Sequence, residues 1–473
     1  MKKFDISEIV KNENLSDTEA FRYAADLCYE NCGGVIYVPK GKYTIASVRL
    51  YSNTHLLMDA EAEIYADPNE ESYGVLRGKY DTYHTRDSAE LLGIPKGEPV
   101  GYIQSLILCN LRRRTDCIFY MDGAENVTIE GGVLDGRYRY FFDIADENQK
   151  ERFGVHVFRL QMIVAFGCRK LTFKNIRIRN NSCFNMRILQ SEDIRCCGVE
   201  ITADKRCLNT DGMNFASSRN ILVENCSFDV GDDCIAFSTG EVEPLCGDCG
   251  DAIVRNCICK TNTDLIRAFA GVEIDVGVIA GLKLDSQIEN AKKQTVRNIL
   301  VENCTLASGG CMVNIIGSFG NVENIRVRNI KGKAENSHPA IFFITQREAK
   351  IRNVAVENID FCGTCAVSIQ GTSRESVKNI TISDSTFTCT PVKKKYYHEL
   401  PDPITEYWIA GEAPNNIFVR HASDVKIENC RIKWHRGEAN EPFPAITVSD
   451  VDGFRAENID ADGYLCDKVI EYK

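Results

Sequence analysis

The chain has 473 residues, and 56 Lys plus Arg against 67 Asp plus Glu give it a formal net charge of −11. An acidic balance excludes general binding to nucleic-acid backbones, which needs clustered positive charge. No apolar run approaches the roughly 18 residues of a membrane span, and no apolar stretch of the secretory type follows the N-terminal lysines. We therefore expect a globular, cytoplasmic protein with neither a nucleic-acid nor a membrane partner. The sequence leaves its oligomeric state open.

The first predicted element is a helix near the N-terminus. Ser16 and Glu19 have the spacing of a capping box, and Gly33 and Gly34 end the pattern. Apolar residues recur at helical spacing in between, namely Phe21, Ala24, Ala25 and Cys28. A strand is expected over 35–38. A helix placed before the first strands can cover the open edges of a stack.

A short pattern then repeats along the chain: an apolar residue, any residue, Asn, and a small apolar residue. Its third position is occupied by Asn175, Gly198, Asn225, Asn256, Asn303, Asn329, Asn358, Asp384, Asn429 and Asn458. The steps between these positions run from 23 to 47 residues, a period typical of stacked repeats. The segments between them are short, β-branched and alternating, and turn residues separate them.

Parallel stacking of such coils, about 4.8 Å apart, predicts an all-β fold, a right-handed parallel β-helix. A β-propeller is the alternative, but its blades need about 40–50 residues. We expect one domain over 1–473 with a short N-terminal capping helix. Residues 68–105 and 390–418 lack the pattern, and we interpret them as loop insertions that wall a cleft.

The 22 cysteines need an explanation in a chain without a secretory signal. Several of them directly follow the repeated Asn, at the place where other coils carry Ile, namely Cys226, Cys257, Cys304 and Cys430. A free Cys at such a position acts as a small core hydrophobe. The pairs at 246–249 and 362–365 have the spacing of zinc ligands, but no second half stands at a fixed distance. We expect reduced, buried thiols and no metal or cofactor.

Three carboxylates stand out. Asp211 and Asp233 are 22 residues apart, about one coil, so they should lie roughly above one another. Asp232 and Asp233 follow Gly231, and both can face the same side only if the backbone bends there. Like charges at close range push pKa values apart, which suits hydrolysis of a sugar linkage by one protonated and one ionised carboxyl group. Turn capping and a calcium site are the alternatives.

These residues resemble glycoside hydrolase family 28, the polygalacturonase-like enzymes. The resemblance rests on Asn-Thr-Asp-Gly at 209–212 and Gly-Asp-Asp-Cys at 231–234. Leu-Asp-Gly at 134–136, Arg-Leu at 159–160 and Ser-Cys-Phe at 182–184 resemble upstream elements of the family. The resemblance implies a pectin-active β-helix and an inverting mechanism, in which Asp232 is the general acid and Asp211 and Asp233 hold and deprotonate the water. It also places Asn209 among the substrate-binding residues.

The chain departs from the family pattern in two places. The family's Gly-His-Gly, one coil after the aspartates, is replaced by a segment that contains Asp264. Asp264 either replaces the His as a substrate-binding residue or caps a turn. The later Arg-Ile-Lys, which grips a uronate carboxylate, has no clear copy. Lys283, Arg267 and Arg187 are the candidate replacements, and a solvated strand position is the alternative interpretation of Arg187. We therefore expect a preference for a modified or mixed pectic oligosaccharide, or a non-uronate sugar, over unsubstituted polygalacturonate.

The function predicted from the sequence is an inverting glycoside hydrolase that cleaves pectic-type or related plant oligosaccharides from one end. The aromatic and basic run over 137–142 is a candidate for stacking on a sugar face. A lyase or epimerase on the same fold and a non-catalytic carbohydrate-binding β-helix are the alternatives. Loss of the family's His and Arg-Ile-Lys favours the non-catalytic protein, and retention of the three aspartates opposes it.

Overall fold

The computed structural model describes residues 1–73, 116–144, 146, 148–149, 153–155, 158–239, 247–270, 285–334, 339–390, 417–435, 444–462 and 469–472. These residues belong to two compact units, 1–233 and 234–473. The single domain expected over 1–473 stays a prediction. No described helix has the length and apolar character that a membrane crossing requires. Most of the loop insertions expected at 68–105 and 390–418 lie outside the described residues.

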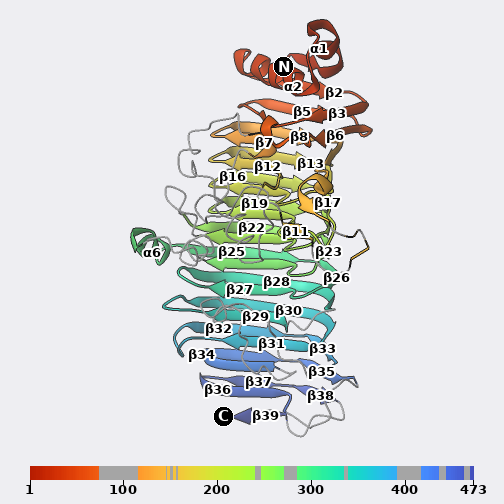
Figure 1. Ribbon diagram of the computed structural model, residues 1–473. Coiled ribbons are helices and arrows are strands. Elements are labelled where there is room, and N and C mark those ends of the chain that lie inside the picture. Colours follow the sequence, from red (N-terminus) through yellow and green to blue (C-terminus); the bar gives the residue numbers. More distant parts are fainter. Residues whose placement is uncertain are drawn as a thin grey trace. The chain divides into compact units, whose positions relative to one another are not determined.

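In the first unit, parallel strands stack in three columns, and each strand pairs with the equivalent strand of the next coil (Figure 1). The first column contains β4 (Val48–Arg49), β7 (Cys117–Asp122), β12 (Gln161–Phe166), β15 (Met186–Leu189) and β18 (Met213–Ala216). The second contains β2 (Gly34–Val38), β5 (Thr54–Met58), β8 (Glu125–Glu130), β13 (Arg169–Lys174), β16 (Glu192–Cys197) and β19 (Arg219–Glu224). The third contains β3 (Gly41–Ile45), β6 (Ala62–Ala66), β9 (Val133–Asp135), β14 (Arg177–Arg179), β17 (Glu200–Thr202) and β20 (Ser227–Asp229).

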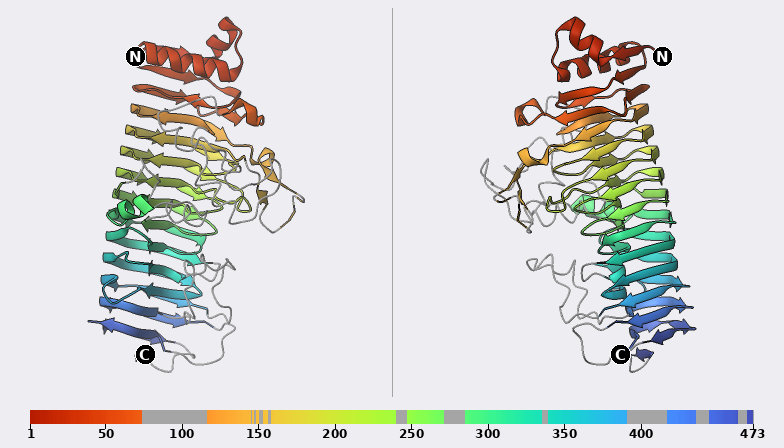
Figure 2. Two further views of the ribbon diagram at one scale, coloured as in Figure 1. Left: turned by 60° about the vertical axis from the view of Figure 1, so that its left-hand side comes forward. Right: turned by 90° about the vertical axis from the view of Figure 1, so that its right-hand side faces the viewer.

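The N-terminal end of this unit is covered by helices, as both views of Figure 2 show. β1 (Lys3–Asp5) pairs with β2, and α1 (Ile6–Glu13) and α2 (Asp17–Glu30) follow. The predicted capping box is confirmed, because the Ser16 side chain accepts from the Glu19 amide and Glu19 reaches back to the Ser16 amide. The sequence reasoning missed α1, although Asp5 caps it by accepting from the Ser7 amide.

The second unit repeats the three-column arrangement. Its first column contains β21 (Ile235–Thr239), β24 (Ile266–Ala270), β27 (Val313–Gly317), β29 (Pro339–Thr345), β31 (Cys365–Gln370), β34 (Ile417–Glu428), β36 (Ile446–Asp452) and β39 (Ile470–Tyr472). The long strand β34 also continues into the second column, where it pairs with β32 and β37. The second and third columns share β28 (Asn321–Ala334) and β30 (Ile351–Gly363). They also contain β22 (Cys249–Arg255), β23 (Ile258–Lys260), β25 (Thr295–Glu302), β26 (Thr305–Gly309), β32 (Val377–Ser383), β33 (Thr386–Cys389), β35 (Arg431–Trp434), β37 (Arg455–Glu457) and β38 (Asp460–Asp462). One short helix, α6 (Asp285–Ala291), precedes β25.

The repeated Asn of the sequence pattern forms ladders at the coil corners. These residues have a left-handed backbone, with φ of 55° at Asn303, 57° at Asn329 and 53° at Asn358. Asn tolerates this conformation better than most residues. Each amide also donates to the amide oxygen of the previous coil, at 3.0 Å from Asn329 to Asn303 and 2.8 Å from Asn358 to Asn329. Gly198 replaces Asn in one coil because a Cβ there would lie 2.5 Å from the Asn175 Oδ1.

The residue after each ladder Asn points into the core, as the sequence predicts. Cys226 and Cys304 are each 2% exposed, and Ile176 and Ile330 are equally buried in other coils. None of the nineteen described cysteines forms a disulfide, and all but three of them are buried. Cys362 is exposed whereas Cys365 is buried, so this C-x2-C pair does not present both thiols to one side. The buried residue after the ladder Asn and the parallel strand pairing together confirm the predicted all-β solenoid.

Candidate active site

The candidate site lies where the third column of the first unit turns back to the first column. Successive turns on this edge occupy 136–160, 180–185 and 203–212, each between two strands, and 230–233 directly after β20. We call them the site turns. The first is the longest and contains η3 (Tyr138–Tyr140) and an antiparallel pair, β10 (Phe142–Asp143) with β11 (Gly154–Val155). Because the turns stack coil upon coil, residues far apart in the sequence meet here.

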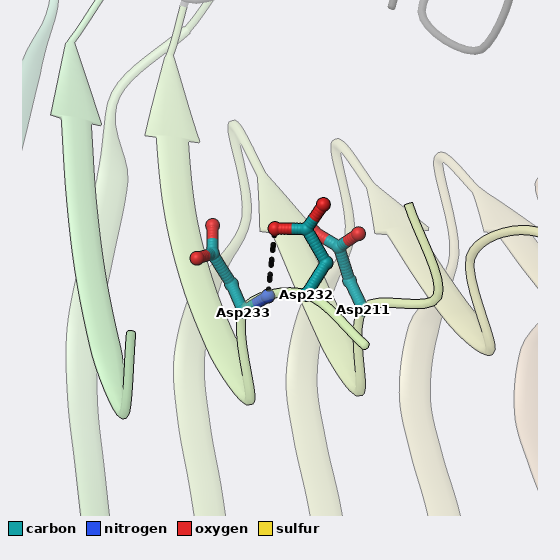
Figure 3. A group of neighbouring side chains, drawn as sticks. All are labelled: Asp211, Asp232 and Asp233. Atoms are coloured by element: carbon teal, nitrogen blue, oxygen red, sulfur yellow. Dashed lines mark hydrogen bonds between the residues drawn. The ribbon is translucent and has the colours of Figure 1, made fainter. Parts of the chain in front are cut away.

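The last two site turns bring the three predicted aspartates together. One side-chain oxygen from each of Asp211, Asp232 and Asp233 lies within 4.8 Å of the others. All three side chains point to the same side, and Asp232 lies between the other two (Figure 3). The Gly212 amide donates to the Asp233 carbonyl at 2.8 Å, which joins the two coils directly at the site. The stacking expected from the 22-residue spacing is therefore confirmed.

The three carboxylates differ in burial. Asp211 is 5% exposed and Asp233 is 2% exposed, whereas Asp232 is half-buried. The Asn214 amide donates to the Asp211 Oδ2 at 2.9 Å, and an Asp232 oxygen accepts from the Asp233 backbone amide at 3.0 Å. The two buried carboxylates thus lie on the floor of the site, and the third is the most accessible.

Gly231 makes the sharp bend before the aspartate pair. A Cβ at this position would lie 2.6 Å from both the Cys207 carbonyl oxygen and the Thr210 hydroxyl. The Gly231 amide donates to that hydroxyl at 3.1 Å, and the hydroxyl in turn donates to the Cys207 carbonyl. Any side chain here would separate the last two site turns and with them the carboxylates, so the bend expected after this glycine is confirmed.

A buried arginine ties three of the site turns together, and the sequence reasoning did not assign it a role. Arg159 is 1% exposed. Its guanidinium donates to the Leu208 carbonyl at 2.8 Å, to the Ser182 carbonyl at 3.4 Å and to the Asn209 Oδ1 at 3.2 Å. The separations of 23 and 49 residues equal one and two coils. That spacing was the available signal, because it places Arg159 beside the turn that leads to Asp211.

Asn209 and Asn185 also hold this turn. Asn209 is 5% exposed and has a left-handed backbone with φ of 55°. Its side chain accepts from Arg159, so the structure places it in the frame of the turn, and its predicted substrate contact is untested. The Asn185 side chain donates to the Asp211 carbonyl at 2.8 Å. The C-terminal part of this turn, which carries Asp211, is thus fixed by hydrogen bonds from two other coils.

Arg187, a predicted substrate-binding residue, lies one coil from Asn214 in the first column. It is 3% exposed, and its guanidinium stacks on the Phe184 ring at 5.0 Å. Its register partner Asn214 donates to Asp211, so Arg187 is a buried cation one coil away from a residue that contacts the carboxylates. The alternative of a solvated strand position is wrong for Arg187.

The remaining predicted residues lie outside this unit. Asp264 and Arg267 belong to the second unit, where Asp264 is 5% exposed and accepts from the Asn314 amide at 2.6 Å. The Asp264 carbonyl accepts from the Cys234 amide, so the residue also holds its turn. Arg267 stacks on the Phe269 ring at 5.0 Å and pairs in register with Asn314. Lys283 lies outside the described residues.

The first site turn forms a wall that contacts the third. The Tyr138 hydroxyl donates to the Asp204 carboxylate at 3.2 Å, and the Tyr138 ring stacks on Phe153. A hydrogen bond from the Arg206 guanidinium lowers the pKa of the Asp204 carboxyl group, so this residue stays ionised. Tyr138 is therefore structural, whereas Tyr140 is 57% exposed and remains able to meet a ligand.

Three clustered carboxylates can do two kinds of chemistry. They can hold a hard cation, and this is the one group of His, Cys, Asp or Glu among the described residues with suitable spacing for a metal. They can also divide into a proton donor and a base that activates water. The geometry alone admits both, and the comparison with known proteins favours the second.

The family model for "Glycosyl hydrolases family 28" matches residues 110–390 of the chain. A "Probable polygalacturonase" from Vitis vinifera is 25% identical over 399 residues, which cover 80% of this chain and 72% of the relative. An "Exopolygalacturonase" from Cochliobolus carbonum is 20% identical over 282 residues, 51% of this chain and 62% of the relative. A solved Family 28 exopolygalacturonase from Yersinia enterocolitica covers 96% of this chain and 78% of its own, with a TM-score of 0.67 at 14% identity. This last likeness shows the β-helix fold.

Proposed function

The chain belongs to glycosyl hydrolase family 28, and from that premise we propose that it cuts pectic or related plant oligosaccharides from one end by an inverting mechanism. As a family member it is a glycoside hydrolase. The observation that carries the proposal is the cluster of Asp211, Asp232 and Asp233 within 4.8 Å on two stacked turns. Relatives named polygalacturonase and exopolygalacturonase support pectic substrates and cutting from one end.

The burial of the aspartates supports a division of roles. The general acid must reach the oxygen of the leaving sugar, and Asp232 is the most accessible of the three. Asp211 and Asp233 lie buried on two neighbouring coils, so they can share and deprotonate one water molecule. This division agrees with the roles that the family resemblance implies.

The spacing of the carboxylates bears on stereochemistry. Inverting glycosidases usually keep their two carboxyl groups about 6.5–9.5 Å apart, whereas retaining enzymes keep them about 5–5.5 Å apart. Here one oxygen of each carboxyl group lies within 4.8 Å of the others, a nearest-atom distance that is compatible with either mechanism. We propose inversion because a third carboxylate is present: two of them hold the water, and neither has to act as a nucleophile. Product stereochemistry separates the two mechanisms.

The state of the cysteines supports the cytoplasmic location that we propose. None of the described cysteines forms a disulfide, and burial raises the pKa of several thiols, among them Cys168 to about 11. Buried, protonated thiols are typical of cytosolic proteins. An enzyme in this compartment would act on imported oligosaccharides, which suits cutting from one end.

The substrate class is tested by comparing kcat/KM on four substrates: polygalacturonate, rhamnogalacturonan fragments, xylogalacturonan fragments and neutral plant oligosaccharides. We expect release of short products from one end, with a modified or mixed pectic chain preferred over plain polygalacturonate. The reason is that a uronate leaving water needs a cation aimed at its carboxylate, and the chain has no clear copy of the Arg-Ile-Lys that supplies this cation in the family. A clear preference for polygalacturonate would overturn this ranking, and hydrolysis of none of the four would overturn the proposed function.

A further inference from the structure

One polar side chain that contacts the three carboxylates has no role in the account so far. Asn214 is half-buried in β18, and its amide donates to the Asp211 Oδ2 at 2.9 Å. It comes three residues after Asp211, so donor and acceptor belong to the same coil. Its partner is one of the two carboxylates assigned to the water molecule, which makes this hydrogen bond a candidate for a part in catalysis.

The orientation of the Asn214 amide is fixed by its partner. An ionised carboxylate only accepts hydrogen bonds, so the N–H side of the amide must face Asp211. The amide oxygen of Asn214 is turned away, and it is buried without a hydrogen-bond donor among the described residues. A buried acceptor without a donor is unfavourable, so stability alone does not explain an Asn at this position.

Other contacts fix the backbone of Asp211 but not its carboxylate. The Asn185 side chain donates to the Asp211 carbonyl at 2.8 Å, and the next residue, Gly212, donates its amide to the Asp233 carbonyl at 2.8 Å. Neither bond sets the rotation of the Asp211 side chain. The Asn214 amide binds one carboxylate oxygen directly and so favours one orientation of that side chain.

The groups around this contact are charged. Those that adjoin Asp211, its turn or Asn214 from other parts of the unit are two carboxylates and two buried guanidinium groups, namely Asp232, Asp233, Arg159 and Arg187. The charged residues at the start of the turn itself form ion pairs there, namely Asp204, Lys205 and Arg206. The Asn214 amide adds a donor to this group without adding a charge or a titrating proton.

The same kind of contact occurs on the second column, where its effect on a carboxyl group is clear. The Asn220 amide donates to the Asp193 Oδ1 at 3.2 Å from the neighbouring coil. This hydrogen bond is the main reason that the pKa of the Asp193 carboxyl group is lowered from its ordinary value. An Asn amide therefore favours the ionised form of the aspartate that it contacts.

We propose that Asn214 is a positioning residue that holds the Asp211 carboxylate ionised and in one orientation, as a base for the attacking water. Asn214 acts through Asp211 and takes no part in the bond changes. This role rests on the proposed function, because Asp211 acts on water only if the site hydrolyses a glycosidic bond.

The first test is kcat across pH for the wild type and Asn214→Leu, measured on the best substrate. Asn214→Leu keeps a side chain of similar length but loses the donor. Its kcat should fall by about 10–100-fold at every pH, with little change in KM, because a misplaced base slows the reaction of bound substrate.

Asn214→Asp is the sharper variant, because it keeps the size and shape of the side chain and makes the donor depend on pH. When the new carboxyl group and Asp211 share one proton, that proton restores the donor. When the proton leaves, two negative charges face each other. The kcat of Asn214→Asp should therefore lie close to that of the wild type at acidic pH and fall about tenfold or more below it as the pH rises.

Asn220→Asp is the matched control, because it places a carboxyl group against Asp193 in the same way but on the second column. Asp tolerates the left-handed backbone of this position, where φ is 55°. Its kcat relative to the wild type should not change with pH. Crystal structures above neutral pH give a readout that needs no activity: in both Asn214 variants the Asp211 carboxylate should be rotated from its wild-type orientation.

An unchanged kcat in Asn214→Leu, a rise in its KM alone, or an Asn214→Asp rate ratio that does not vary with pH would overturn the positioning role while the proposed function stands. Asn214→Asp decides the question if Asn214→Leu does not fold. If the wild type cuts no substrate, the proposed function fails. The crystals then decide the positioning of Asp211 by themselves, and an unchanged carboxylate would overturn it.

Discussion

The asparagine ladders and the site turns both form sharp corners between parallel strands, but different interactions hold the two kinds of corner. At the ladder of Asn303, Asn329 and Asn358, one residue type repeats with one backbone conformation, and each amide bonds the next. At the site turns no residue repeats. Arg159 there reaches across three turns, and Asn185 bonds the carbonyl of Asp211.

This difference shows how the fold separates stability from chemistry. A ladder corner needs only local conformation and the contact with the next coil, so one Asn contributes the same interaction in every coil. A site turn holds buried carboxylates close together, which is unfavourable unless other groups fix them. We therefore expect ladder changes to lower stability with little effect on rate, and site-turn changes to do the reverse.

The largest expected effect is at the aspartates. Asp232→Asn should lower kcat by about 10²–10⁴-fold, because the amide cannot donate a proton to the leaving oxygen. Asp211→Asn and Asp233→Asn should be nearly as damaging. Asp229→Asn is the matched control, since Asp229 is a neighbouring carboxylate that pairs with Lys205 on the surface. Activity above one tenth of wild type in all three variants, measured as released reducing ends, would refute the assignment.

The next effect is at Arg159. Arg159→Met should lower kcat by about 10–100-fold with little change in KM, because a residue that is 1% exposed positions the turn and does not touch substrate. Arg159→Lys keeps one charged donor and should recover part of the rate. Thermal unfolding of both variants separates positioning from misfolding. A rise in KM with unchanged kcat would contradict this positioning role. So would a loss of rate that the fraction of unfolded variant protein explains in full.

A ladder residue should show the opposite behaviour. Asn329→Ala should destabilise the protein by about 1–3 kcal/mol, because it loses two ladder hydrogen bonds and places Ala at φ of 57°. Asn329→Gly removes only the hydrogen bonds and should cost less. The measurement is the melting temperature together with kcat on one substrate. An unchanged melting temperature for Asn329→Ala, or a tenfold fall in its kcat, would contradict the claim that ladder corners serve stability and site turns serve catalysis.

The smallest effect concerns the core behind the ladders. Burial raises the pKa of Cys430 to about 11, and that of Cys28 likewise to about 11, so these thiols should react slowly at neutral pH. Among the described residues, Cys32 and Cys362 are exposed and should react first. Thiol titration should find all 22 cysteines in denaturant without reductant. Fewer thiols, or bound zinc in stoichiometric amount, would show that the core cysteines have another role.

The repeat made much of the fold predictable. The spacing of the Asn residues gave the coil length, and the shared place of Cys226 and Ile176 identified the inward position. The helix α1 was missed because it is short, and its cap, Asp5, precedes an apolar pattern of only three residues. The sequence did not show what the Asn does. It forms a left-handed corner and bonds the next coil, and this requires knowledge of the register between coils.

The site was predictable only in part. The three aspartates could be found because two of them are one coil apart and the third is adjacent. The spacing of Arg159 from the neighbouring turns was a signal, but it did not assign a role, because the bonds of Arg159 depend on the lengths of several irregular turns. The burial of Arg187 was also hidden, because β15 is buried on both faces while strands of the second column alternate.

The central claim is that the three aspartates hydrolyse a glycosidic bond with an activated water molecule. Proton NMR of a pectic oligosaccharide during the first turnovers by the wild-type enzyme tests it most directly. The account predicts a new reducing end whose anomeric configuration is opposite to that of the bond cut, before mutarotation mixes the anomers. A product with retained configuration would show that one carboxylate acts as a nucleophile, and an unsaturated product would show elimination; either would contradict the account.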